Sequence, residues 1–282
     1  MESSDFQAFV CKYGVLAGAQ ALAVTALAPL ERCKLILQTQ AQVKVPHVER
    51  YPSFSAYLRT VPRVEGFRRF WRGNSASIGH IAVSTLLRYP LLPILLTPNS
   101  LAVQSALGLG LLAVTYPLDL VRTRLACDLM RKAERPIYEG LVDTLVKTLS
   151  DEGFRGLFKG LSVGLGAFLP LLLLEQALSY PVALYLKQHS DSMLEDQIKK
   201  HSISLAIAQL CLYPADTIRR KLQVAGDRNH EGVNSARQCC ARLYRVEGIK
   251  GFYSGIMLNT LRLPPTLAIF YYLSDFTRIS PY

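Results

Sequence analysis

The sequence predicts an all-α membrane protein in which a six-transmembrane-helix bundle is built from three pseudo-symmetric repeats. Half of the 282 residues are hydrophobic and only 19% are charged. The apolar residues fall in long runs, and one short motif occurs three times. So much apolar content excludes intrinsic disorder. The six Cys lack paired spacing, so we expect neither a disulfide scaffold nor a metal site.

Five apolar runs contain the predicted spans. They cover residues 13–30, 74–118, 160–186, 201–215 and 255–274. A spanning helix needs about 20 residues, so the second run holds two spans with a turn near residues 97–100, and the others hold one each. We place the repeats at residues 1–97, 98–192 and 193–282.

Basic residues gather between the runs. Residues 31–72, 119–159 and 216–254 contain 25 of the 32 Lys and Arg. By the positive-inside rule these segments share one side of the membrane, and both termini lie on the other. The net charge of +11 therefore indicates topology and contact with lipid head groups. No nucleic-acid partner is expected, because no DNA-binding motif is present.

The first repeated motif is Pro-x-acid-x-x-base. Pro kinks a helix, and an acid and a base three residues apart share one helix face. Three such helices around an axis would form a ring in which each acid meets the base of another repeat. The predicted pairs are Glu31–Arg122, Asp119–Arg219 and Asp216–Lys34, with Gln38 and Gln223 as braces and Ala126 at the third brace position. The alternative is that the three pairs are separate, solvated surface ion pairs that contribute little to stability.

The second repeated motif is acid-Gly followed by aromatic-base-Gly. It ends at Arg72-Gly73 and Lys159-Gly160, and with Ser254 in place of the base at Gly255. Each Gly precedes a predicted helix, whose N-terminal N–H groups offer a seat for a lipid phosphate. The third site, at Gly255, should bind a lipid phosphate most weakly.

These tripled motifs resemble those of the mitochondrial carrier family over nearly the whole chain. Within the family, residues 28–35 and 116–126 are most similar to ADP/ATP carriers. The resemblance implies a multi-pass protein of the inner mitochondrial membrane, with its basic loops in the matrix and its termini toward the intermembrane space. It also implies that the ring is a matrix gate, and that cardiolipin binds at Gly73, Gly160 and Gly255, near Arg72 and Lys159.

The chain departs from the family pattern in two places. The opposite gate should have an acid and a base at the far end of each even-numbered helix, but residues 88–96 and 179–184 contain no acid, and only Asp275 and Arg278 remain. The ADP/ATP pattern also has Lys and Arg where this chain has Val24 and His80. Much of the phosphate-binding charge is therefore missing.

The candidate substrate-binding residues lie on the even-numbered helices. Seven residues after each helix-starting Gly, at about 10 Å depth, stand His80, Ala167 and Arg262, with Phe168 next to Ala167. Arg88 and Glu175 share a second depth, and charges inside a membrane are usually functional. We hypothesise that they pair; the alternative is that each reaches water or a head group separately. For Arg262 and His80 the alternatives are purely structural roles.

Two functions are compatible with these residues. The first is a carrier that moves a small anionic metabolite by alternating access, with adenine nucleotides among the candidates and Arg262 as the anion anchor. The second is a degenerate carrier that serves as an accessory subunit of a respiratory-chain or ATP synthase assembly. An enzyme is not expected, since no nucleophile–base or metal constellation is present. Bound cardiolipin is the only cofactor-like molecule expected.

Overall fold

The computed structural model describes residues 3–40, 51, 53–88, 101–128, 136–187, 203–225, 233 and 235–262. All regular structure within these ranges is helical, which confirms the predicted all-α class. The long helices are α1 (Ser3–Thr39), α3 (Asn74–Arg88), α5 (Leu101–Cys127), α7 (Leu161–Lys187) and α9 (Tyr213–Val224), with further helix at 203–211 and 256–262.

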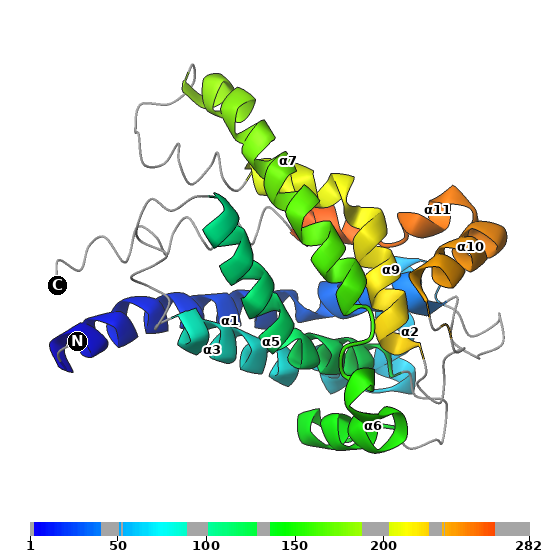
Figure 1. Cartoon of the computed structure of the whole chain (residues 1–282). Helices are drawn as coiled ribbons and strands as arrows, with labels where there is room; N and C mark the ends of the chain where they lie inside the picture. Colours follow the sequence, from blue (N-terminus) through cyan, green and yellow to red (C-terminus); the bar gives the residue numbers. More distant parts are fainter. Residues whose placement is uncertain are drawn as a thin grey trace.

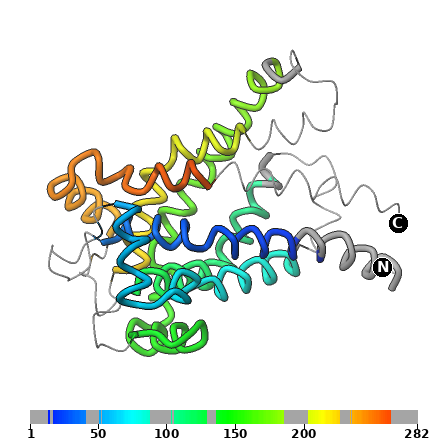
Figure 2. Tube along the Cα trace, turned by 180° about the vertical axis from the view of Figure 1, so that it is seen from behind, coloured from blue at the N-terminus to red at the C-terminus, as the bar shows by residue number. Residues whose placement is uncertain are grey.

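The long helices converge at one end of the molecule. Figure 1 shows α5 and α7 rising away from α1 and α3 toward the end where α1 begins, whereas α1, α5 and α7 meet α9 at the opposite end. Figure 2 shows the same divergence from behind. The described helices therefore converge at one end and diverge at the other.

Short helices surround the end at which the long helices converge. They are α2 (Phe54–Val64), η3 (Phe67–Trp71), α6 (Leu141–Gly156), α10 (Ala236–Glu247) and α11 (Ile249–Phe252). Ser53 and Ser235 cap α2 and α10, because each hydroxyl accepts a hydrogen bond from a backbone N–H in the first turn. These helices carry the basic segments, so the basic segments lie together at one end, as predicted.

Proline acts differently in the three repeats. Pro29 and Pro117 lie inside α1 and α5. In the third repeat the helix is interrupted at Leu212, and α9 begins afresh with Pro214 in its first turn. A Pro in the first turn costs no hydrogen bond, since that N–H would have no helical partner. The expected kink is thus a full break here.

Two described helices are long and apolar enough to cross a membrane. These spans are Ser105–Cys127 and Leu161–Leu184, with mean hydropathies of 1.2 and 1.7. Helix α3 and the helix at 256–262 both stop where the described residues stop. The predicted turn near residues 97–100 and the remains of the outer gate at Asp275 and Arg278 lie outside the described residues.

Candidate functional site

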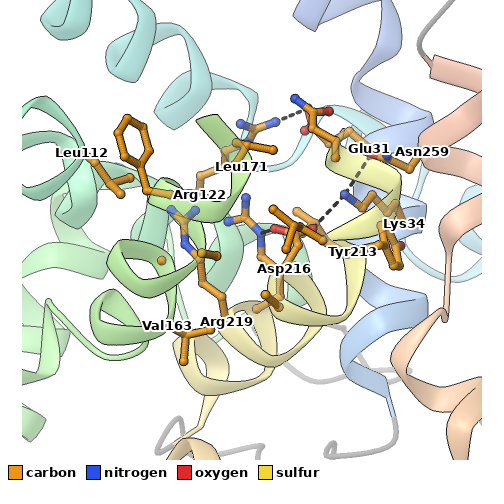
Figure 3. Close-up of a pocket in the computed structure, with 18 of the residues that line it drawn as sticks. Glu31, Lys34, Leu112, Arg122, Val163, Leu171, Tyr213, Asp216, Arg219 and Asn259 are labelled. Carbon is orange, nitrogen blue, oxygen red and sulfur yellow. Dashed lines mark hydrogen bonds and ion pairs between the residues drawn. The ribbon is translucent and has the colours of Figure 1, made fainter. Parts of the chain in front are cut away.

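A cavity lies between the converging helices. Its volume is about 300 Å³, and it is lined by residues of α1, α5, α7, α9 and the last described helix. Its lining includes charged groups, among them Arg122 and Arg219, and apolar side chains of α5 and α7. Figure 3 shows Lys34 and Tyr213 facing Leu112 and Val163 across this space.

The floor of the cavity is the predicted ring. Lys34 Nζ lies 3.0 Å from Asp216 Oδ2, Arg122 pairs with Glu31, and Arg219 pairs with Asp119. These are the three pairings expected from the tripled motif. Their side chains are between 9% and 29% exposed, so the alternative of separate solvated surface pairs is wrong.

The two glutamine braces lie where they were predicted. Gln223 Nε2 donates to Asp119 at 2.9 Å, and Gln223 is fully buried. Gln38 Nε2 donates to Asp216 at 3.5 Å and to the Thr217 hydroxyl at 3.3 Å. The Glu31–Arg122 pair has Ala126 at the corresponding position. The ring is therefore braced at two of its three pairs.

Two arginines that the motif did not predict as ring members also bind ring carboxylates. Arg220 Nη1 lies 2.9 Å from Asp119 Oδ1, and its Nε lies 3.4 Å from Asp216 Oδ1. Arg262 Nη1 lies 2.5 Å from Glu31 Oε1, on the carboxylate that also binds Arg122. The proposed anion anchor is thus bound directly to the unbraced pair. Arg220 follows the motif base immediately, but nothing in its spacing distinguishes it from a surface residue.

Three glycines pack the starts of α3, α7 and the helix at 256–262 onto the ring. Gly73, Gly160 and Gly255 all have positive φ, of 88°, 84° and 79°. A Cβ at each would lie 3.0 to 3.2 Å from the backbone carbonyl oxygen of Arg122, Arg219 or Lys34, respectively. Each helix start therefore rests on the base of a ring pair, a contact that sequence analysis did not anticipate.

A second tier of ion pairs joins each kinked helix to its short helix. Arg32 Nη2 lies 2.6 Å from Glu65 Oε2, Arg124 Nη2 lies 2.7 Å from Glu152 Oε1, and Lys221 Nζ lies 3.0 Å from Glu247 Oε1. The acids belong to the repeated acid-Gly motif. The bases were missed because Arg32 follows its Pro by three residues, whereas Arg124 and Lys221 follow theirs by seven.

Two predicted lipid contacts have partners within the protein. Arg72 binds Asp128, and it donates to the carbonyl oxygen of Tyr138 at 2.7 Å. Lys159 Nζ lies 2.5 Å from Glu152 and donates to the carbonyl oxygen of Ala225. The Arg72 side chain is buried and its charge is satisfied inside the protein, so contact of Arg72 and Lys159 with a lipid phosphate stays a prediction. The helix starts at the three glycines remain predicted seats.

The structure brings together half of the predicted substrate-binding residues. Ala167, Phe168 and Arg262 line the cavity. His80 does not line it but is half-buried, with the ring residues Asp119 and Arg122 as electrostatic neighbours. Glu175 is buried in α7 outside the cavity lining. The Arg88 side chain is outside the described residues, so the Arg88–Glu175 pair stays a prediction.

The residues that line the cavity suit reversible anion binding. The described residues contain no group of three His, Cys, Asp or Glu side chains that could hold a metal ion. What lies at the cavity floor is instead a set of guanidinium groups shared among carboxylates. An anion that competes for these guanidinium groups would loosen the ring.

Comparison with known proteins identifies a matching family model and relatives of this chain. A family model described as "Mitochondrial carrier protein" matches residues 9–91, 98–178 and 202–279. The chain is 30% identical to ADP/ATP translocase 4 of Homo sapiens over 276 residues, covering 88% of this chain and 85% of that protein. It is 31% identical to ADP/ATP translocase 2 of Bos taurus over 277 residues, covering 88% and 90%.

Proposed function

Because the chain belongs to the mitochondrial carrier family, whose members are transporters and not enzymes, we propose that it moves a small anionic metabolite by alternating access. One observation carries the proposal: a ring of three inter-repeat ion pairs closes the floor of a cavity that is rich in arginine. We place the ring on the matrix side of the inner mitochondrial membrane, with the termini toward the intermembrane space. Lipid phosphates, including those of cardiolipin, would bind at the starts of α3, α7 and the helix at 256–262.

The proposed mechanism uses Glu31 as the link between substrate and ring. An anion bound by Arg262 competes with Glu31 for the same guanidinium. Glu31 then has Arg122 as its remaining partner in the ring, at the pair that lacks a glutamine brace. A ligand shifts such an equilibrium by the difference between its affinities for the two states. Arg262 would therefore convert anion binding into opening of the ring at its weakest pair.

Transport in liposomes tests this function. The purified chain, reconstituted with cardiolipin, should exchange labelled anions across the membrane, and Arg262→Gln should abolish the exchange. Gln238→Ala, an exposed change on α10, serves as the matched control and should leave exchange unchanged. Absence of exchange for nucleotides, inorganic phosphate and dicarboxylates alike would reject the carrier function.

One observation favours the accessory role as a second candidate. Val142, Val146 and Leu149 form an exposed apolar stripe on α6, with exposures of 70%, 60% and 49%. Aligned on the acid-Gly motif, α2 has Ser55, Arg59 and Pro62 at these positions, and α10 has Arg237, Ala241 and Tyr244. The fold therefore does not require an apolar stripe there. Co-purification of the chain with a large membrane complex, combined with absence of transport, would support this role.

A further inference from the structure

The charge balance of the cavity indicates what kind of anion it takes. Resting on the carrier function proposed above, we infer that the substrate is a doubly charged phosphate monoester with an apolar body. Counting the charged lining residues and Asp119, which pairs with two of them, the described part of the site holds five bases and three acids: Lys34, Arg122, Arg219, Arg220, Arg262, Glu31, Asp119 and Asp216. The excess is two positive charges.

This excess sets the charge of the best ligand. A site enclosed by helices within a membrane is costly to load with unbalanced charge, so a bound anion should bring the total near zero. A phosphate monoester carries about two negative charges at neutral pH. A nucleoside diphosphate or triphosphate would bring more negative charge than the described residues can offset.

Two of the bases already converge on one anionic group. Arg122 and Arg262 hold the two oxygens of one carboxylate, that of Glu31. The Nε of Arg219 is buried and has no hydrogen-bond acceptor among the described residues. Guanidinium groups bind phosphate oxygens well because their donors are planar and paired. A phosphate group displacing Glu31 would gain the donors of Arg122 and Arg262, whereas a dicarboxylate has its two charges too far apart to do so.

The apolar part of the cavity lining suits the rest of the ligand. Leu112, Val163, Ala167, Phe168 and Leu171 line it. The Phe168 ring is held against Gly108 of α5, where an added Cβ would overlap it. A fixed aromatic ring offers a stacking surface to a flat apolar group. The volume of about 300 Å³ is at the lower end for small-molecule pockets, which favours a compact ligand.

Thermal unfolding of the full chain in detergent with cardiolipin tests the inference. The probes are adenosine, AMP, ADP, ATP, inorganic phosphate and malate, each without divalent cations. AMP should stabilise most, with an apparent affinity about ten-fold above that of ADP or ATP, which is a difference of about 1.4 kcal/mol. Adenosine should have no effect. Phe168→Ala should weaken AMP but not inorganic phosphate, which lacks the apolar body.

Added charge should change the preference in a defined direction. His80 has the ring residues Asp119 and Arg122 as electrostatic neighbours. His80→Arg adds one positive charge beside the ring, so the preferred ligand should move from AMP toward ADP. Asp143→Asn, a change at a partly exposed position on α6, is the control and should leave the order of ligands unchanged.

The outcomes separate this inference from the carrier function itself. If ATP and ADP bind and exchange better than AMP in the unmodified chain, the carrier function stands and the inference is wrong. A preference for malate over AMP, or equal binding of AMP and inorganic phosphate, would also overturn it. If none of the probes binds or exchanges, the proposed function itself fails.

Discussion

Gly160 lies directly against the backbone of Arg219. A Cβ at Gly160 would be 3.0 Å from the Arg219 carbonyl oxygen and 2.9 Å from the Tyr116 hydroxyl. The Tyr116 hydroxyl in turn donates to the carbonyl oxygen of Lys159 at 2.7 Å. The start of α7 is thereby seated on a ring base of another repeat. Equivalent seats at Gly73 and Gly255 make this contact part of the fold.

Gly160→Ala should destabilise the protein by about 2 to 4 kcal/mol. A positive φ costs a non-glycine residue about 1 kcal/mol or more, and the Cβ would press on backbone atoms that cannot move freely. Apparent melting temperature in detergent is the measurement. Gly166→Ala is the control, because a Cβ there meets nothing within 4 Å; equal effects of the two changes would contradict the close contact.

Gln223→Ala should cost about 1 to 3 kcal/mol, since it removes a buried amide that donates to Asp119 and accepts from Arg220 and Thr123. The change should also weaken closure of the ring, so that transport becomes faster or leaky. Gln238→Ala, on the exposed side of α10, should shift the melting temperature little. A Gln223→Ala variant as stable as that control would show that the brace contributes nothing.

The Arg32–Glu65 pair should behave as a buried ion pair. The two side chains are 1% and 0% exposed, so Glu65→Gln leaves a buried charge unpaired and should cost about 3 to 5 kcal/mol. Replacing both with Met should recover much of that loss, because hydrophobic pairs can substitute for buried ion pairs. Asp143→Asn breaks an exposed pair with Lys147 and should cost less than about 1 kcal/mol. Similar losses for the buried and exposed pairs would be inconsistent with this account.

Val146→Arg should leave folding and transport unchanged, because Arg59 occupies the equivalent position of α2. If α6 contacts another subunit, this change should release the chain from the larger assembly on native gels. Val246→Arg, at an exposed position of α10 (63% exposed), is the matched control. Release by both variants, or by neither, would remove the support for an α6 interface.

The sequence predicted the fold and the ring because both depend on repetition. Glu31, Asp119 and Asp216 occupy matching positions, so a single geometric argument placed all three ion pairs. The second tier was missed because its first base, Arg32, stands a helical turn earlier than its counterparts Arg124 and Lys221. Periodicity cannot reveal a partner that changes its position between repeats.

Contacts between distant residues were also beyond sequence reasoning. Arg262 and Glu31 are 231 positions apart, and both were candidate site residues, but for different roles. Arg72 was assigned to lipid from its place in the motif, yet it is satisfied by Asp128 inside the protein. A motif identifies which residues are special, while packing decides which neighbours they meet.

Substitutions that swap the charges of Lys34 and Asp216 test the central claim most directly. Transport of labelled anions into cardiolipin liposomes should be compared for the unmodified chain, Lys34→Asp, Asp216→Lys and the double variant. If the ring is the gate of a working carrier, each single change should reduce transport by about ten-fold or more, and the double variant should regain a substantial part of it. Single variants that transport as well as the unmodified chain, or a double variant no better than either single, would contradict the account.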